Sequence, residues 1–551
     1  MVLSMLLALL ALVTIGFAAF LLYLKRKHSK SPLPGLPTPP NPQWLIGHME
    51  DRTIPLDESL KKICLQHANA SGVTAMWYFD TSCATVIRYQ DARAILQSTP
   101  ARMNMPGLVK KQLQMLTGPN NILLLEGKEW KYHRTAIMKA LNRETLEKSH
   151  VISVEAAFQL CDALEERIQS SLGDKIEVEL YSLLQLLTMD IFGLAGFDFA
   201  FHNSRNLQWH PVAAKFQFMK DEYERRMNNP MTGYFFGLPT KHNRDHAQAN
   251  KMVRSFIEGI VEERSAQKEL GGDFLGNLLR AREDLKEASS SKMDGKSHDS
   301  IEDTMTDVIL TLLFAGQDTT ALAITYAILE IARNPRVNKS IQEEINLVWK
   351  TQEEGNEEGN TSLPDPAALV YCSAVITEAL RLYPSLPGFV RTLTKPVKVG
   401  EGSEEYTLPI DTYTYIPFWL IHRDERNFER ATDFLPERWV KKNSEGKWEE
   451  RDAAKGKKQS DQQAVSDEKK VCDADSVVQV GAGNKNAFFA FSTGGRSCAG
   501  EKFAKLETVL VLASILKKLD FSWKEGWDLK VMHASTGQKP SDMVPIMVSV
   551  R

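Results

Sequence analysis

The stretch with the clearest chemical potential is Phe491–Gly500, which reads FSTGGRSCAG and places a single cysteine near the end of a glycine-rich loop. After Cys498, the apolar residues Phe503, Leu506 and Leu510 recur at three- and four-residue intervals, which is the period of a helix. We therefore expect the sulfur to lie at a helix N-terminus, where the helix dipole and free backbone N–H groups favour the thiolate over the thiol. A thiolate held in this way is a suitable ligand for iron.

Two simpler interpretations of Cys498 are a buried, inert thiol and a zinc ligand. Buried cysteines without a chemical role are common. A structural zinc site needs four nitrogen or sulfur ligands at short spacings, and no second cysteine lies near Cys498 in the sequence. Gly494 and Gly495 indicate a ligand site instead, because residues without a Cβ let the main chain approach a flat ligand closely.

The whole string resembles the heme-binding signature of the cytochrome P450 family, Phe-x-x-Gly-x-Arg-x-Cys-x-Gly, and it matches every fixed position. The resemblance implies that the cofactor is heme b (iron protoporphyrin IX) and that the thiolate of Cys498 is the proximal ligand of the iron. It also implies that Arg496 pairs with a heme propionate, that Phe491 shields the sulfur, and that Gly494 keeps the loop close to the heme.

A long helix is predicted over residues 300–333, because a capping-box pattern precedes it and an Asn-Pro pair follows it. Its apolar centre gives way to Ala315–Thr320, which reads AGQDTT. A charge in a buried helix is costly unless it is satisfied or used, and the glycine and hydroxyls could open the helix into a groove. The string is similar to the oxygen-binding segment of the family. The resemblance implies that Ala315 leaves room for dioxygen, that Thr319 holds it at the iron through water, and that Asp318 relays protons from solvent. Without the cysteine loop, a kinked core helix would explain the string equally well.

A structural ion network is the next expectation. Glu378 and Arg381 fall three residues apart in a helical pattern, and such pairs are common on solvated helix faces. The resemblance gives them another role, because the family locks a Glu-x-x-Arg pair to the arginine of a later Pro-Glu-Arg string. Arg438 stands in that string here. We expect the three side chains to form a buried network that supports the heme side of the core.

Further heme contacts are implied by family position. Trp130 and Arg134 lie one helical turn apart, which alone would indicate an ordinary surface contact. In the family, a Trp-x-x-x-Arg pair reaches the heme propionates, and Arg391 resembles another propionate partner. His422 could be mistaken for a metal ligand, but its family position lies away from the iron, so we expect it to be structural.

The N-terminal residues 1–24 are predicted to be a transmembrane anchor. No charged residue occurs from Val2 to Leu24, and at 1.5 Å per residue this run would span roughly 34 Å, enough for a hydrocarbon core of about 30 Å. A cleaved signal peptide fits less well, because the run is long and its positive charge follows it. The basic flank favours a cytosolic catalytic domain, and we expect a single-pass protein of the endoplasmic reticulum membrane.

The rest of the chain divides into a hinge and one large domain. Residues 25–42 are basic and proline-rich, which favours a stiff spacer, and residues 43–551 are assigned to the catalytic domain. Aromatic and β-branched residues between about 75 and 90 predict short strands. Residues 231–237 occupy the family position of a substrate-channel lid, with a solvated loop as the alternative. Residues 441–485 form a long polar insertion whose composition predicts a solvated or disordered loop.

Composition excludes some classes of function. With 67 Lys and Arg against 70 Asp and Glu, the net charge of −3 gives no basic excess for nucleic acid. The six cysteines have no paired spacing, which favours a reducing compartment over a disulfide framework.

The predicted fold is mainly α with small β-sheets, the cytochrome P450 fold, preceded by one transmembrane helix. The resemblance implies a monooxygenase that inserts one atom of dioxygen into a lipophilic substrate, with fatty acids or related lipids as candidates. Electrons would come from NADPH through NADPH-cytochrome P450 reductase, with cytochrome b5 as a second donor, because the chain has no flavin or nicotinamide fingerprint. The alternatives are a heme-thiolate isomerase or dehydratase, which needs no reductase, and a non-catalytic heme sensor.

Overall fold

The computed structural model describes residues 2–42, 47–48, 55–78, 81–98, 107–228, 237–289, 301–355, 363–451, 480–534, 537–540 and 543–551. They belong to two compact units. Unit 1 comprises residues 1–104, 387–421 and 493–496, and unit 2 comprises residues 105–386, 422–492 and 497–551. The predicted combination of many helices with small sheets is confirmed.

Unit 1 is built on a four-stranded sheet with the strand order β1-β2-β7-β4. β1 (Val73–Tyr78) pairs antiparallel with β2 (Thr81–Val86), and β2 pairs parallel with β7 (Tyr413–Ile416). β7 pairs antiparallel with β4 (Phe389–Thr392). The first two strands lie where the aromatic and β-branched residues predicted them. The smaller elements of the unit are α2 (Leu56–Leu60), η1 (Lys61–Leu65), α3 (Tyr89–Ser98), β5 (Val397–Val399), η3 (Gly402–Glu404), β6 (Tyr406–Leu408) and most of α16 (Phe418–His422).

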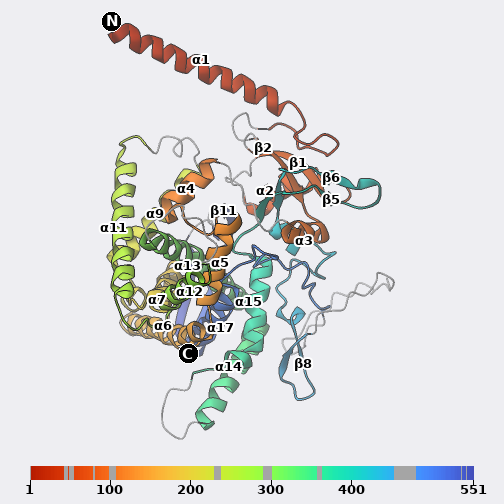
Figure 1. The fold of residues 1–551 in the computed structure, drawn as a ribbon. Coiled ribbons are helices and arrows are strands. Elements are labelled where there is room, and N and C mark those ends of the chain that lie inside the picture. The colour runs from red at the N-terminus through yellow and green to blue at the C-terminus, as the bar shows by residue number, and fades with distance from the viewer. Residues whose placement is uncertain are drawn as a thin grey trace. The chain divides into compact units, whose positions relative to one another are not determined.

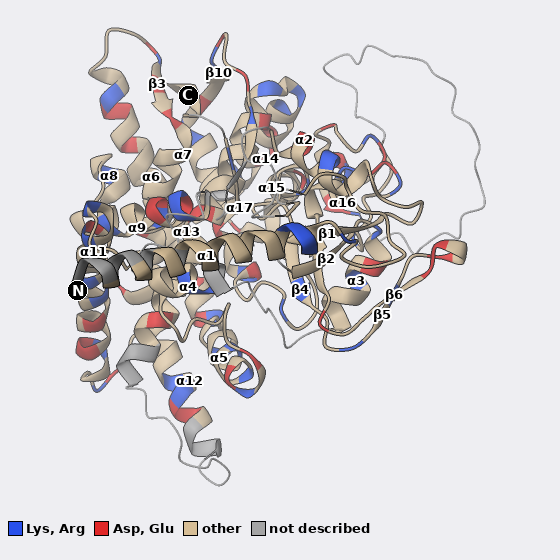
Figure 2. Ribbon diagram, turned by 90° about the horizontal axis from the view of Figure 1, so that it is seen from above, with Lys and Arg blue, Asp and Glu red and all other residues tan. Residues whose placement is uncertain are grey.

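Helix α1 (Val2–His28) contains the predicted anchor and continues through the basic flank. Residue 24 therefore marks a change of composition rather than the end of the helix. Large apolar side chains on it are exposed, among them Met5, Leu12 and Leu22. Figure 2 shows the described part of α1 without charge until the basic residues at its C-terminal end.

The C-terminal end of α1 is fastened to the sheet of unit 1. The ring of His28 lies 5.5 Å from that of Trp77 in β1. The indole Nε1 of Trp77 donates a hydrogen bond to the carbonyl of Lys30, at 3.0 Å. The hinge that follows α1 is thus ordered by unit 1 at its first residues.

Unit 2 is a helical assembly around α13 (Ile301–Arg333), which forms the predicted long helix without interruption (Figure 1). α13 packs against α7 (Leu180–Phe197), α11 (Lys241–Ser265), α15 (Val370–Leu382) and α17 (Glu501–Lys518). The remaining helices are α4 (Gly107–Thr117), α5 (Gly127–Ala140), α6 (Arg143–Gln169), α8 (Asn203–Asn206), α9 (Pro211–Asn228), α12 (Phe274–Ser289), α14 (Pro335–Gly355), η2 (Pro366–Ala368) and η4 (Pro436–Arg438).

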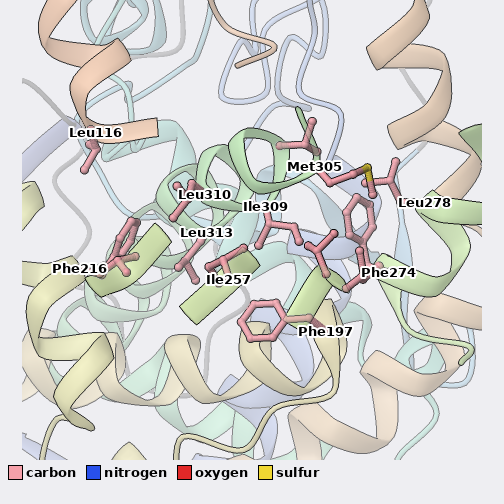
Figure 3. Packing of buried hydrophobic residues seen from close by; sticks show 14 of the residues in the cluster. Leu116, Phe197, Phe216, Ile257, Phe274, Leu278, Met305, Ile309, Leu310 and Leu313 are labelled. Atoms are coloured by element: carbon pink, nitrogen blue, oxygen red, sulfur yellow. The ribbon is translucent and has the colours of Figure 1, made fainter. Parts of the chain in front are cut away.

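The largest apolar cluster of unit 2 surrounds the N-terminal half of α13. Figure 3 shows Ile309, Leu310 and Leu313 among side chains of neighbouring helices, including Phe197 and Phe216. All five are at most 2% exposed. Each such side chain stabilises the fold by about 1.5–3 kcal/mol through removal of apolar surface from water. In the described part of the chain, residues 180–197 and 305–333 are long and apolar enough to cross a membrane, but they lie mostly inside the unit, as core helices do.

The strands of unit 2 form a three-stranded sheet and two hairpins. The sheet has the order β10-β13-β3, and one hairpin joins β11 to β12. The other hairpin, β8 (Val440–Lys442) with β9 (Trp448–Glu450), lies at the start of the predicted polar insertion. These residues are solvated as expected, because most of them are exposed, but they form a hairpin rather than a loop. The other strands are β3 (Ile176–Glu179), β10 (Leu519–Trp523), β11 (Val531–Ala534), β12 (Gly537–Pro540) and β13 (Pro545–Val550).

Three sequence-based expectations fall outside the described residues. They concern residues 231–236 of the predicted lid, Ser300 of the capping box, and residues 452–479 of the polar insertion.

Candidate functional site

The cysteine loop of unit 2 is shaped by main-chain hydrogen bonds. The amide of Ser492 donates to the carbonyl of Phe489 at 2.7 Å, and the amide of Cys498 donates to that of Phe491 at 2.9 Å. Ser492 takes a left-handed conformation, with φ of 59°, to make this reversal. Helix α17 starts at Glu501, so Cys498 lies just before its first turn, as the apolar spacing predicts.

Cys498 is the accessible cysteine among the free cysteines of the described ranges, where the other four are buried. Crowding by protein atoms nevertheless raises the pKa of its thiol, and the Gly500 amide and Arg134 lower it without reversing the shift. The backbone N–H at the helix N-terminus therefore lowers the pKa of Cys498 as expected, but this effect is smaller than that of burial, and the thiol stays favoured. An accessible sulfur with nearby N–H groups fits a metal ligand, because a bound cation would supply the missing stabilisation of the thiolate.

Gly494 belongs to unit 1, where its backbone conformation and a close contact with α3 require glycine. Its φ is +78°, and a Cβ at this position would stand 2.5 Å from the carbonyl oxygen of Leu96. Backbone strain and this close approach to α3 exclude a side chain.

Trp130 and Arg134 lie on one face of α5, with the guanidinium 6.0 Å from the indole ring. Arg134 Nη2 also contacts Ser497 Oγ at 3.4 Å. Burial lowers the pKa of Arg134, and the Cys498 thiolate raises it. The structure thus brings Arg134 to the cysteine loop within unit 2.

Arg391 in β4 is a fully buried guanidinium with an incomplete set of partners. It donates from Nη1 to the Val390 carbonyl at 2.9 Å, whereas Nε and Nη2 are buried without an acceptor. Burial and the positive charge of Arg496 lower its pKa to about 9. Two arginines side by side in unit 1, one with orphaned donors, fit an anionic group such as a carboxylate, which is what a heme propionate offers.

The centre of α13 has one accessible stripe. Leu312, Ala315, Gly316 and Thr319 are half-buried, although most of the helix around them is buried. Their spacing places them on one face. Thr319 Oγ1 donates to the Ala315 carbonyl at 2.7 Å, the expected back-bond to residue i−4. The helix keeps its regular form here, so accessibility comes from small side chains rather than from an opened groove.

Asp318 points into the protein, away from solvent. Its side chain is 2% exposed, and Oδ1 accepts hydrogen bonds from Lys220 Nζ at 2.8 Å and Gln185 Nε2 at 2.7 Å. Lys220 Nζ also donates to Gln317 Oε1 at 2.7 Å. Any proton relay through Asp318 therefore stays a prediction, and the structure adds that Lys220 and Gln185 hold its carboxylate.

Burial and charge act on both members of the Lys220–Asp318 pair. Burial pushes the pKa of the Asp318 carboxyl up, but the charges of Lys220 and Lys539 and the hydrogen bonds outweigh it, and the net pKa is lowered. For Lys220, burial prevails and lowers the pKa. The lowered pKa of Asp318 favours its carboxylate, which accepts the short bond from Lys220 Nζ.

Glu378, Arg381 and Arg438 meet in unit 2 as the sequence predicted, all at most 1% exposed. Arg381 Nη2 and Nε donate to the two carboxylate oxygens of Glu378 at 2.8 and 2.9 Å, and Arg438 Nε donates at 3.0 Å. Trp439 Nε1 adds a bond at 2.9 Å that the sequence did not reveal.

Several partners of this site were missed. Lys220 and Gln185 are single polar residues in helical patterns, so nothing in the sequence marks them as buried. Glu507 on α17 is another, a carboxyl that is 4% exposed. Among the described residues, no group of three or more His, Cys, Asp or Glu side chains could hold a metal ion.

Glu507 gives a prediction for stability. Burial raises the pKa of its carboxyl from 4.5 to about 8. The folded protein then retains a proton that the unfolded chain releases, so this contribution to stability is full below pH 4.5 and declines as the pH rises to 8. A shift of this size corresponds to a loss on the order of 3–5 kcal/mol. Glu507→Gln, which stays neutral, should remove that slope. Urea unfolding of both proteins between pH 5 and 9 measures the free energy of unfolding at each pH. The same pH dependence in both proteins would contradict the raised pKa of Glu507.

Comparisons with known proteins identify relatives of this architecture. The family model described as Cytochrome P450 matches residues 37–541. "Cytochrome P450 4V2" of Mus musculus is 24% identical over 461 residues, which cover 81% of this chain and 76% of the relative. "Cytochrome P450 CYP72A616" of Paris polyphylla is 26% identical, covering 81% and 75%.

A solved structure shows the same fold. The crystal structure of a cytochrome P450, CYP102L1, superimposes with a TM-score of 0.65 at 21% sequence identity. The match covers 87% of this chain and 92% of that one.

Proposed function

The chain belongs to the cytochrome P450 family of monooxygenases, and from this premise we propose that it inserts one atom of dioxygen into a C–H bond of a lipophilic substrate. The other oxygen atom leaves as water. The observation that carries this proposal is Cys498, an accessible thiol at the start of α17 with Arg134 beside it. The half-buried stripe of α13 that contains Thr319 supports it.

In unit 2, Cys498 would provide the iron ligand of heme b, with Phe491 in the same loop and Arg134 as a propionate partner. In unit 1, the family resemblance assigns Arg391 and Arg496 to the propionates as well. When bound, heme supplies dioxygen binding and reductive O–O cleavage, which an axial thiolate promotes. The orphaned Nε and Nη2 of Arg391 support this assignment most directly.

Thr319 is the proposed proton-handling residue. Its hydroxyl is held by the Ala315 carbonyl, yet its side chain stays accessible, so it can bond a water molecule and pass a proton from it. The small side chains of Ala315 and Gly316 leave space beside Thr319 on the same face of α13. Asp318 can serve the same path only through Lys220 or Gln185, which hold its carboxylate.

The electrons and the membrane are further parts of the proposal. The chain has no nucleotide- or flavin-binding fingerprint, so we assign NADPH-cytochrome P450 reductase as donor, with cytochrome b5 as a second donor. Exposed apolar side chains on α1 and the basic residues at its end support a single-pass anchor in the endoplasmic reticulum membrane, with a cytosolic catalytic domain. Lipophilic substrates that partition into lipid, with fatty acids as the first candidates, fit that location.

The proposal is tested with the full chain, the reductase and isotopically labelled dioxygen. A Soret titration against fatty acids, sterols and terpenoids first identifies the class of compound that displaces water from the iron. That compound should then gain one labelled oxygen atom, with NADPH consumed. Product formed without NADPH would indicate an isomerase or dehydratase. Heme binding without substrate-dependent oxygen uptake would indicate a sensor.

Thr319→Ala should lower product formation by about a hundredfold, because proton delivery is lost. NADPH consumption should continue, with reduced oxygen released as peroxide. Thr325→Ala is the matched control, since Thr325 makes the same 2.7 Å bond to the carbonyl four residues earlier but is buried. Product and peroxide are measured together. Equal product yields from the two variants would exclude Thr319 from proton delivery.

A further inference from the structure

His422, the last residue of α16, is fully buried and bonded through both ring nitrogens. Nδ1 lies 3.0 Å from the carbonyl oxygen of Arg381, and the amide of Phe489 donates to Nε2 at 2.8 Å. A carbonyl oxygen can only accept, so Nδ1 carries the proton and Nε2 is the acceptor. Burial lowers the pKa of the ring to about 3, which keeps this neutral form over the working range of pH.

One side of the ring faces the buried ion network. The guanidinium of Arg381 donates from Nη1 to the carbonyl of His422 at 2.8 Å, in return for the bond from Nδ1. The same guanidinium holds Glu378 through two bonds. His422 is thereby joined twice to one of the most rigidly bonded parts of unit 2.

The other side of the ring faces the cysteine loop. The amide of Phe489 donates to Nε2, and the carbonyl of Phe489 accepts a bond from the Ser492 amide at the turn of the loop. The carbonyl of Phe491 then accepts a bond from the Cys498 amide. The imidazole also stacks on Phe488, with ring centroids 5.4 Å apart and planes 12° from parallel. Fixing Phe489 therefore fixes the start of a short chain of bonds that ends at the Cys498 amide.

We propose that His422 is a positioning residue. By bonding both Arg381 of the ion network and Phe489 of the cysteine loop, it holds the loop that carries Cys498 in place. The inference rests on the proposed role of Cys498 as the iron ligand. It goes beyond a structural role, because removal of the ring should change how the sulfur is held as well as how stable the fold is.

Three substitutions separate the two bonds. Asn places an amide nitrogen where Nδ1 stands and retains the bond to the Arg381 carbonyl. Gln reaches farther and can offer its oxygen to the Phe489 amide in place of Nε2. Ala loses both. His422→Asn and His422→Gln thus test the two halves of the connection, and they remain informative if His422→Ala fails to fold.

The control is His48, a buried histidine of unit 1 with the mirrored pattern. It accepts the Trp77 amide at Nδ1, at 2.9 Å, and bonds the Pro39 carbonyl through Nε2 at 2.8 Å. His48→Ala removes a similar ring and a similar pair of bonds, and both bonding partners, Trp77 and Pro39, lie outside the cysteine loop. It therefore reports the general cost of losing a buried histidine.

Two readouts need neither substrate nor reductase. One is the fraction of the reduced carbon monoxide complex that keeps the red-shifted Soret band of thiolate ligation, and the other is the rate of heme loss to a scavenger protein. His422→Ala should lose heme roughly tenfold faster and show a smaller thiolate fraction, since a buried donor is left unpaired. The Asn and Gln variants should fall between it and the wild type.

Equal thiolate fractions and heme-loss rates in folded His422→Ala and His48→Ala would overturn the proposal, and so would wild-type values in both His422→Asn and His422→Gln. Failure of the underlying assignment gives a different result, because Cys498→Ala would then keep the red-shifted band whatever stands at position 422.

Discussion

Replacement of Cys498 by alanine is expected to abolish the red-shifted Soret band of the reduced carbon monoxide complex and all substrate oxidation. The band depends on a thiolate bound to iron, and alanine offers no ligand. Among the described cysteines the other four are buried, so none of them can take over without unfolding its surroundings. The expected change is complete loss, the largest effect predicted for any single side chain of this protein.

The matched control is Cys161→Ala. Cys161 lies buried in α6, and burial raises the pKa of its thiol well above the usual range, so it is chemically inert. Alanine is a good helix former, and the fold should tolerate the change. Absorption spectra of both variants, recorded after reduction under carbon monoxide, settle the assignment. An unchanged band in Cys498→Ala would remove the thiolate ligand from the proposed mechanism.

The sequence was sufficient to predict those elements whose signal lies in one continuous run of residues. The cysteine loop occupies ten consecutive residues, and the apolar spacing after it indicated α17. The long helix α13 was likewise predicted within one residue at its start, from the capping-box pattern, and correctly at its end, from the Asn-Pro pair that follows it. Local patterns of this kind carry their own geometry.

Contacts between distant residues could not be predicted in the same way. The Lys220–Asp318 pair joins α9 to α13 across 98 positions, and a single lysine in an amphipathic helix normally faces water. The sequence therefore did not reveal that Asp318 is held by Lys220 and Gln185 inside the protein. Only the packed structure shows which charge is buried with it.

The hairpin at the start of the polar insertion was missed because its charges suggested a solvated loop. Lys441 and Glu449 instead pair across the two strands at 3.0 Å. Trp448 stacks on Tyr371 of α15 with ring centroids 4.6 Å apart, which anchors the hairpin. Trp448, a large aromatic residue among charged neighbours, was the one feature of this sequence segment that indicated a packed element.

Glu378→Ala is expected to leave little folded, heme-loaded protein. The carboxylate accepts bonds from Arg381, Arg438, Trp439 and the Leu435 amide, all inside the unit. Its removal leaves two guanidinium groups buried without their counter-charge. Breaking a buried pair in this way costs about 3–5 kcal/mol, a large share of the 5–15 kcal/mol that a typical domain has in total.

The pH dependence of the same group has a definite sign. Burial pushes the pKa of Glu378 up, but Arg381 and Arg438 outweigh it and the net pKa is lowered. A carboxyl with a lowered pKa in the folded state stabilises the protein above its unfolded pKa of 4.5, and this contribution is lost as the pH falls through the folded value. Acid unfolding should therefore begin at a higher pH in Glu378→Gln, which keeps the shape of the side chain but not its charge.

Glu147→Ala supplies the comparison, because Glu147 makes a 2.6 Å ion pair with Arg143 on an exposed helix face. Solvent screens such a pair, and its loss should not change the urea midpoint measurably. Yield, heme content and unfolding midpoints of the three variants show whether the Glu378 network stabilises the fold or takes part in the reaction. If Glu378→Ala folded with full heme content and only turned over slowly, the network would act on the reaction itself, and the route from Arg381 through His422 to the cysteine loop would be the first place to look for the connection.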